Sequence, residues 1–241
     1  MSFRNVYQDP RRASAYASLE FPGTYFLAYR DLPALYREHV RGRRAIDFGC
    51  GAGRSTRFLK ELDFDVIGID VSADMIARAR ERDPAGEYRV IADGDFRAFP
   101  DGGFDLVQSV FTFDNIPGRE HKIALFAGIA ALLADGGRLM SLVSTPDIYV
   151  NEWASFTTRQ FATNASARAG DPVFTVMNDV EDKRPVEDVL WPHDDYLDVY
   201  RRAGLAIVAE HRPLGRDDEG IAWVSETRIA PWAIYVLERI A

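Results

Sequence analysis

The stretch that decides the fold reads DFGCGAG and covers residues 47–53. Its first two residues end a run at 44–48 that reads as a buried strand, and the pattern of 54–62 predicts a helix directly after the stretch. Three glycines between a strand and a helix let the backbone turn sharply and approach a ligand without a Cβ in the way. On a sheet of parallel strands, such a turn predicts a ligand site at the strands' carboxyl ends.

The alternation of strand and helix continues along the chain. Further strands are expected at 65–70, 88–92, 104–110 and 138–143. Further helices are expected after Ser72 or Asp74, which act as caps, and over 119–134, where Asp135 and two glycines end the helix. Strands alternating with helices predict an α/β fold with a parallel sheet covered on both faces.

The segments outside this unit are also informative. Residues 1–42 are expected to form an N-terminal helical cap of two helices, broken at 21–23. The connection 146–192 is far longer than a typical loop, and a long excursion at a sheet edge is typical of a lid. Short strands are expected inside it at 173–177 and 186–190, followed by a helix at 194–203 and strands at 205–211 and 231–238. We therefore divide the chain into the cap, 1–42, and one domain, 43–241, that carries the insertion 146–192.

Composition narrows the class of protein. The 241 residues are 47% hydrophobic and 27% charged, which suits a globular domain. The 29 basic and 37 acidic residues give a net charge of −8, which argues against a nucleic-acid binder. No apolar run is long enough to span a bilayer, the first residues lack a signal-peptide core, and the lone Cys50 excludes an internal disulfide. We expect a cytoplasmic monomer or homodimer that binds neither nucleic acid nor a membrane.

Three classes of ligand use glycine-rich turns of this kind. Dinucleotides require Gly-x-Gly-x-x-Gly, but counting from Gly49 the third glycine is replaced by Arg54. Nucleoside triphosphates require a Gly-Lys pair, which the chain lacks. A nucleoside that carries a zwitterionic amino acid needs close backbone approach and a carboxylate, but no phosphate cradle. Asp47 and the glycines suit this third class.

Several ordered motifs resemble one family. Residues 47–53 resemble motif I of class I S-adenosylmethionine-dependent methyltransferases. Residues 66–76 are similar to that family's second strand with its ribose-binding acid, 94–105 to its adenine-binding loop, 132–139 to its motif before strand five, and 194–205 to its closing helix and sixth strand. The resemblance implies a doubly wound, mostly parallel, seven-stranded Rossmann-like sheet, with S-adenosylmethionine as cofactor and S-adenosylhomocysteine as product.

The cofactor contacts are predicted on this basis. Asp70 ends the second strand, about 20 residues beyond the glycines, where a carboxylate accepts both ribose hydroxyls. The resemblance implies that Asp95 and the Phe96 backbone meet the adenine, while Met75 covers its face or belongs to the core. Arg30 of the cap is expected to pair with the methionine carboxylate. The predicted cofactor set is Asp47, Gly49, Cys50, Gly51, Gly53, Asp70, Val71, Met75, Asp95, Phe96, Ser109 and Arg30.

The acceptor side offers three catalytic candidates. They are Asp114 after the fourth strand, His193 before the closing helix, and Tyr16 in the cap. Histidine suits proton transfer at neutral pH. Each candidate has a structural alternative, which is turn capping for Asp114, helix capping for His193 and packing for Tyr16. No grouping of His, Cys and carboxylates has metal-ligand spacing, so no metal is expected.

The sequence therefore predicts a methyltransferase that moves a methyl group from S-adenosylmethionine to an O, N or C atom of a small molecule. Two alternatives stay open: a methyltransferase acting on RNA or protein, and a non-catalytic S-adenosylmethionine-binding protein. A basic face around the pocket mouth would favour the first alternative. A site closed beside the methyl group would favour the second.

Overall fold

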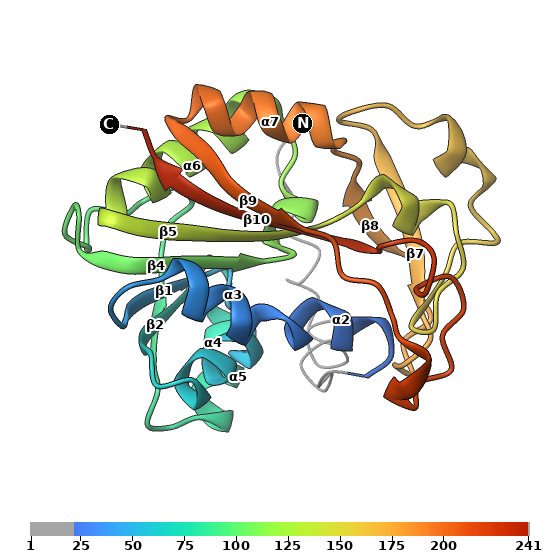
Figure 1. Cartoon of the computed structure of the whole chain (residues 1–241), viewed down its shortest axis with the longest axis horizontal. Helices are drawn as coiled ribbons and strands as arrows, with labels where there is room; N and C mark the ends of the chain where they lie inside the picture. The colour runs from blue at the N-terminus through green and yellow to red at the C-terminus, as the bar shows by residue number, and fades with distance from the viewer. Residues whose placement is uncertain (1–21, 241) are drawn as a thin grey trace.

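A seven-stranded sheet forms the centre of the structure, a computed structural model that describes residues 22–240 (Figure 1). The strands lie in the order β3-β2-β1-β4-β5-β10-β9. Their bounds are β1 (Arg44–Phe48), β2 (Asp65–Asp70), β3 (Glu87–Val90), β4 (Phe104–Val110), β5 (Leu133–Ser144), β9 (Leu205–His211) and β10 (Trp232–Arg239). The pairs from β3 to β5 are parallel, and β10 runs antiparallel to both of its neighbours. The predicted mostly parallel, seven-stranded sheet is confirmed.

Helices cover both faces of this sheet. Their bounds are α2 (Thr24–Arg30), α3 (Leu32–His39), α4 (Arg54–Glu61), α5 (Ala73–Arg82), α6 (Arg119–Leu132) and α7 (His193–Arg202). Figure 1 shows α6 and α7 over one face and α2 to α5 over the other. Each face has its own apolar core, with Leu27 and Leu59 buried in one and Phe126 and Val199 in the other. Because both faces are covered, the central strands are apolar along most of their length.

The glycine turn occupies a central place in the sheet. Residue Asp47 of β1 pairs with Gly68 of β2 on one side and Gln108 of β4 on the other. All three strands run in the same direction, so their carboxyl ends lie together at one edge. The turn that follows β1 therefore opens onto an edge bordered by β2 and β4, which is where an open parallel sheet binds ligands.

The insertion after β5 forms a small sheet of its own. It has the order β6-β7-β8, with β6 (Phe156–Thr157), β7 (Pro172–Met177) and β8 (Val186–Val189). Short 3-10 turns, η3 (Pro146–Tyr149) and η4 (Ala162–Ser166), precede and follow β6. The apolar side chains of this sheet join the same core as α2 and the start of β10. The insertion therefore packs beside the carboxyl-end edge of the main sheet (Figure 1).

Two expectations about boundaries were wrong. Helix α6 ends at Leu132 and β5 begins at Leu133, where a helix to 134 and a strand from 138 were expected. The extra strand residues exist because Leu133 pairs with Phe104 across an irregular register. The N-terminal segment also differs, because α2 and α3 both follow the break at 21–23 and are separated at Asp31. The helix expected before that break lies outside the described residues.

The longest helix between residues 22 and 240 is α6, with 14 residues. No helix in this part of the chain has both the length and the apolar character that crossing a bilayer requires.

Candidate functional site

Two glycines shape the turn after β1. Gly49 and Gly51 have φ values of 71° and 53°, a region that side chains with a Cβ rarely adopt. A Cβ on Gly49 would lie 2.1 Å from Oγ1 of Thr112, whereas one on Gly51 would meet only the Met75 methyl, at 3.8 Å. The backbone at Gly49 therefore touches the segment after β4, and the backbone at Gly51 faces open space.

Asp47 lies beneath this turn and is fully buried. Its Oδ2 accepts hydrogen bonds from the hydroxyls of Ser55 and Thr56, each at 2.6 Å. Burial raises the pKa of Asp47, while these hydroxyls partly offset that rise. The side chain fastens the end of β1 to the first turn of α4, so it positions the glycines from behind.

Asp70 ends β2 and faces the turn from the neighbouring strand. Its Oδ2 accepts the N–H of Gly51 at 2.9 Å, and its Oδ1 accepts the N–H of Ser72 at 2.8 Å. Ser72 in turn caps α5, because its Oγ accepts the N–H of Met75. Burial raises the pKa of the Asp70 carboxyl. These contacts fix the carboxylate between the glycine turn and the start of α5.

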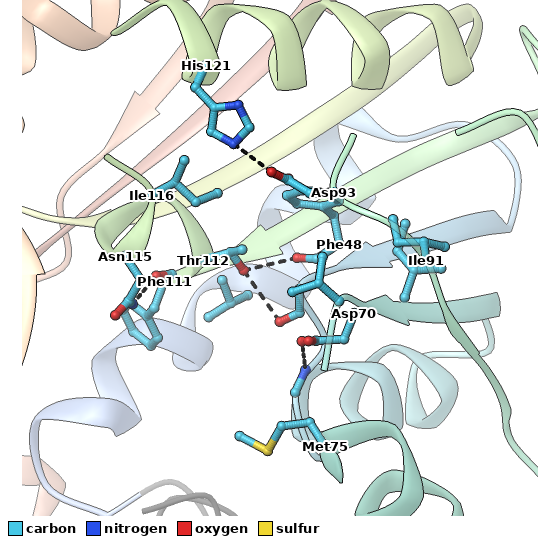
Figure 2. Close-up of a pocket in the computed structure, with 15 residues that line it drawn as sticks. Phe48, Asp70, Met75, Ile91, Asp93, Phe111, Thr112, Asn115, Ile116 and His121 are labelled. Carbon is cyan, nitrogen blue, oxygen red and sulfur yellow. Dashed lines mark hydrogen bonds and ion pairs between the residues drawn. The ribbon is translucent and has the colours of Figure 1, made fainter. Parts of the chain in front are cut away.

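A cavity opens at these strand ends, with about 820 Å³ of empty space including its mouth. We call it the strand-end cavity (Figure 2). Asp70 lies at its base, and Val71, Met75 and Ile91 give it apolar walls. At another part of its lining, the His121 Nε2 atom lies 3.1 Å from the Asp93 carboxylate. A carboxylate beside exposed backbone, with apolar walls further along, suits the sugar and the flat base of a nucleoside.

The structure brings some of the predicted cofactor residues together. The members that line the strand-end cavity are Gly49, Gly51, Asp70, Val71 and Met75. Three others lie behind it. The thiol of Cys50 is buried, and burial raises its pKa. Gly53 lies against the ring of Tyr88. Ser109 is buried within β4. Their predicted roles are therefore indirect, through the shape of the turn and of the sheet.

Asp95 and Phe96, the predicted adenine contacts, do not line the strand-end cavity. Asp95 binds the guanidinium of Arg97 at 2.6 and 2.8 Å and lines a separate surface hollow. The ring of Phe96 packs against Phe48, with their centroids 5.9 Å apart. Asp93, two residues before Asp95, lines the strand-end cavity instead. Asp93 was not among the predicted residues, and the only signal for it was a carboxylate just beyond the third strand.

Two further candidates, Arg30 and His193, lie outside the strand-end cavity. Arg30 donates to Asp31 at 2.8 and 2.9 Å and also binds Glu219. His193 is the first residue of α7, and its Nδ1 lies 2.8 Å from the Tyr235 hydroxyl. Tyr16 belongs to the residues that the structure does not describe. None of the cavities described here is lined by Arg30 or His193.

A second cavity adjoins the first, with about 420 Å³ of empty space including its mouth. It shares Phe111 and Asn115 with the strand-end cavity. Its walls carry four aromatic rings, so we call it the aromatic cavity. The rings belong to Tyr25, Phe111, Phe156 and Trp232. They come from α2, from the residue after β4, from the insertion and from the start of β10, so the chain brings four distant segments to one place.

Phe111 separates the two cavities and has an unusual backbone. Its φ is 61°, in the left-handed region, where a residue with a Cβ is disfavoured by about 1–2 kcal/mol. Its N–H donates to the Leu142 carbonyl at 2.9 Å, and its own carbonyl accepts the N–H of Asp114 at 3.2 Å. Such strain persists where surrounding contacts hold it, and it is concentrated at functional sites.

Buried charges lie next to the aromatic cavity. Asp114 lines the cavity and accepts hydrogen bonds from the N–H and hydroxyl of Ser144, the latter at 2.7 Å. Burial raises the pKa of Asp114 to about 6. Burial lowers the pKa of Lys122 to about 7, and its ammonium donates to the Phe113 carbonyl and lies 5.1 Å from the Trp191 ring centre. Asp114 was predicted, whereas Lys122 was missed because it reads as an ordinary helix lysine.

One carboxylate ties together the segments around the aromatic cavity. Glu226 is fully buried, and its Oε1 accepts from the Thr24 hydroxyl at 2.6 Å and from the Ala154 N–H at 2.8 Å. Thr24 also accepts, through its carbonyl, the indole N–H of Trp232 at 2.9 Å. The start of α2, the insertion and the segment before β10 therefore form one hydrogen-bonded unit.

Comparison with known proteins identifies the class. Residues 45–137 match the family described as "Methyltransferase domain". An uncharacterized methyltransferase of Geobacillus thermodenitrificans is 36% identical over 120 residues, which cover 46% of this chain and 54% of that protein. The cypemycin N-terminal methyltransferase of a Streptomyces species is 39% identical over 146 residues, which cover 57% and 56%. The chain thus spans about half the length of these curated relatives.

A solved structure supports the same class. An S-adenosylmethionine-dependent methyltransferase from Clostridium acetobutylicum has a TM-score of 0.63 at 12% identity, over 98% of this chain and 97% of that one. The chain therefore has the class I, Rossmann-like methyltransferase fold. Residues 45–137 therefore match a methyltransferase domain within that fold, in agreement with the family resemblance and the cofactor predicted from the sequence. Within residues 22–240, no three His, Cys, Asp or Glu side chains are grouped as metal ligands.

Proposed function

We propose that this protein transfers the methyl group of S-adenosylmethionine to an O, N or C atom of a small-molecule acceptor. The observation that carries the proposal is the pair of adjoining cavities, which share Phe111 and Asn115. Methyl transfer requires two molecules to meet at one point, with the acceptor in line with the methyl group. A strand-end cavity for the cofactor and an aromatic cavity for the acceptor satisfy that requirement.

S-adenosylmethionine, when bound, supplies a methyl group on a positively charged sulfur, so the protein must mainly bind, orient and exclude water. We assign the ribose hydroxyls to Asp70, because its carboxylate lies at the base of the strand-end cavity. Val71 and Met75 then flank the base, and the backbone at Gly51 faces the cofactor without a Cβ. Holding both reactants in place is worth about 7–11 kcal/mol of the barrier.

A small acceptor is supported by the charge around the cavities. The ionisable side chains that line the strand-end cavity are Asp70, Asp93 and His121. RNA binding depends on Lys and Arg contacts to phosphates, and among residues 22–240 no Lys or Arg lines this cavity. A peptide acceptor stays as the alternative, since one relative carries the name of an N-terminal methyltransferase. An open cavity beside the cofactor site argues against a purely non-catalytic binding protein.

Calorimetry with S-adenosylmethionine and S-adenosylhomocysteine tests the cofactor side of the proposal. Asp70→Ala is expected to weaken binding at least about 100-fold, because two charge-assisted hydrogen bonds are worth about 1.5–3 kcal/mol each. The matched control is Asp65→Ala, which removes the exposed carboxylate at the opposite end of the same strand. It is expected to bind as the wild type does.

Two results would contradict the proposal. One is the absence of binding by the wild-type protein, and the other is unchanged binding by a folded Asp70→Ala protein. Formation of S-adenosylhomocysteine from S-adenosylmethionine, screened over metabolite extracts, then tests the transfer itself.

A further inference from the structure

The aromatic cavity presents hydrogen-bond acceptors to its interior. Asp114 and Asp188 line it, and so does Asn115. The Oδ1 atom of Asn115 is buried and has no hydrogen-bond partner among the described residues, while its amide nitrogen donates to the Phe111 carbonyl at 3.4 Å. An unpaired buried acceptor is costly, so a ligand that brings an N–H donor satisfies it.

Aromatic rings form the rest of the wall. The ring centres of Phe111 and Trp232 lie 4.6 Å apart, and Tyr25 and Phe156 lie 5.1 Å apart. Trp232 also contacts Tyr25 at 6.1 Å and Phe156 at 5.9 Å. The faces of such rings carry negative potential and attract ammonium groups, and Trp does so most strongly. Rings and carboxylates on one cavity wall therefore favour a cation over an anion.

The cations near the aromatic cavity do not reverse its preference for a cationic ligand. Arg54 lies over the ring of Tyr25, with its guanidinium carbon 5.0 Å from the ring centre, so this ring already has a cation on one face. Lys122 interacts electrostatically with both Asp114 and Asp188. Asp188 also accepts a hydrogen bond from the Tyr149 hydroxyl at 3.2 Å. Within residues 22–240, Asp114 and Asp188 are the charged side chains that line this cavity, whereas Lys122 and Arg54 lie outside its lining.

We propose that the methyl acceptor is an amine with a compact apolar body, which makes the protein an N-methyltransferase. This inference rests on the proposed function. The amine binds as an ammonium, loses one proton to water, and its neutral nitrogen then attacks the methyl carbon. The N–C bond forms as the C–S bond breaks, the electron pair of that bond stays on sulfur, and the resulting ammonium later loses a proton to water.

The direction of charge movement separates an amine from an oxygen acceptor. With an amine, positive charge moves from sulfur to nitrogen, so it develops where the Asp114 and Asp188 carboxylates, the Asn115 oxygen and the rings lie. Groups that stabilise charge developing in the transition state accelerate the reaction. An anionic oxygen acceptor would instead be repelled by both carboxylates, and its charge would disappear during transfer.

Binding of two matched probes tests the inference without relying on turnover. Benzylamine, a cation at neutral pH, and benzyl alcohol, its neutral counterpart of the same shape, are titrated by calorimetry into protein saturated with S-adenosylhomocysteine. We expect benzylamine to bind at least tenfold more tightly. Asp188→Asn is expected to reduce benzylamine affinity about tenfold. Glu187→Gln is the matched control, because Glu187 is the exposed neighbour on the same strand, and it should change neither affinity.

Methyl transfer provides the second measurement. Benzylamine and phenol are each incubated with S-adenosylmethionine, and the methylated products are separated by mass. N-methylation at least tenfold faster than O-methylation supports the inference. If Asp188→Asn does not fold, Phe156→Leu replaces it and is expected to weaken benzylamine several-fold more than benzyl alcohol, because it removes a ring face while keeping apolar volume.

The outcomes separate the two proposals. If S-adenosylhomocysteine binds but benzyl alcohol binds as tightly as benzylamine, or phenol is methylated faster, the amine inference is overturned and the proposed function stands. Binding of neither probe to the loaded protein also overturns the inference. If neither S-adenosylmethionine nor S-adenosylhomocysteine binds at all, the proposed function fails, and the inference fails with it.

Discussion

The strand-end cavity and the aromatic cavity share a wall, yet they are built in different ways. The first is lined by the ends of neighbouring parallel strands and depends on backbone geometry at Gly49 and Gly51. The second is lined by side chains from α2, the insertion and β10, and two carboxylates face it. A site fixed by backbone tolerates few changes of shape, whereas a site of packed side chains can change its ligand by single substitutions. The comparison predicts different responses to mutation on the two sides.

The largest expected effect is at Gly49. Gly49→Ala places a Cβ 2.1 Å from the Thr112 side chain at a φ of 71°. Overpacking and the disfavoured φ together are expected to lower the free energy of unfolding by about 2–4 kcal/mol. Urea unfolding measures this loss. The control is Gly136→Ala, which also has a positive φ, of 76°, but no atom within 4 Å of the added Cβ.

The control should cost only about 1–2 kcal/mol, which is the conformational contribution alone. Equal losses for the two variants would show that the contact with Thr112 is unimportant. The strand-end cavity would then be less rigid than its backbone suggests.

The next effect concerns the buried charges beside the aromatic cavity. The pKa of Lys122 is about 7 in the folded protein and 10.5 ordinarily, so the unfolded chain binds this proton more tightly. The corresponding stability is complete above pH 10.5 and is lost as the pH falls through about 7. Compared with Lys122→Met, the wild-type protein should therefore gain about 1 kcal/mol per pH unit between about pH 7 and 9.5.

Urea unfolding of both proteins across this range measures the difference. Lys183→Met, the same change at a more exposed residue, is the control and should run parallel to the wild type. If the difference in unfolding free energy between the wild type and Lys122→Met did not change with pH, burial would not have lowered the pKa of Lys122.

A smaller effect is expected at Asp93, in the lining of the strand-end cavity. Asp93→Asn should weaken S-adenosylmethionine binding several-fold, about 1 kcal/mol, because Asp93 lines the cavity beside His121. Asp95→Asn should change affinity less than twofold, since its carboxylate faces Arg97. Calorimetry on both variants decides between the two carboxylates. A larger loss for Asp95→Asn would instead support the adenine contact that the sequence resemblance implies for Asp95.

The smallest effect is expected at Arg30, which lies outside both cavities. Its guanidinium is engaged by Asp31 and Glu219, so Arg30→Ala should change S-adenosylmethionine affinity less than twofold. The dissociation constant measured by calorimetry checks this. A tenfold loss in a variant of unchanged thermal stability would show that Arg30 leaves these partners to bind the cofactor.

The sequence predicts the strand-end cavity better than the aromatic cavity for a physical reason. Strands β2 and β4 have the predicted bounds because each is an apolar run flanked by turn-forming residues. The start of β5 was misplaced because pairing of Leu133 with Phe104 depends on the neighbouring strand. Asp70 was found from its spacing to the glycines, since both belong to one local succession of strand, turn and helix.

The aromatic cavity has no such local signal. Tyr25 and Trp232 lie near opposite ends of the described chain, and they meet only because β10 runs antiparallel and begins at the ligand-binding edge. The insertion was expected to form a lid at a sheet edge, and its Phe156 lines this cavity. The left-handed backbone of Phe111 could not be predicted from the sequence, because the residue is neither glycine nor asparagine.

The contacts of Glu226 have a consequence for how the acceptor enters. Because Glu226 accepts from Thr24 and Ala154, neither of these two segments can move away alone without removing a partner of a buried carboxylate. Trp232 cannot move away alone without breaking its hydrogen bond to the Thr24 carbonyl. Opening of the aromatic cavity therefore requires these segments to move together. We expect new acceptor preferences to arise by substitution of the side chains that these segments place in the aromatic cavity, while the hydrogen bonds that join the segments are kept.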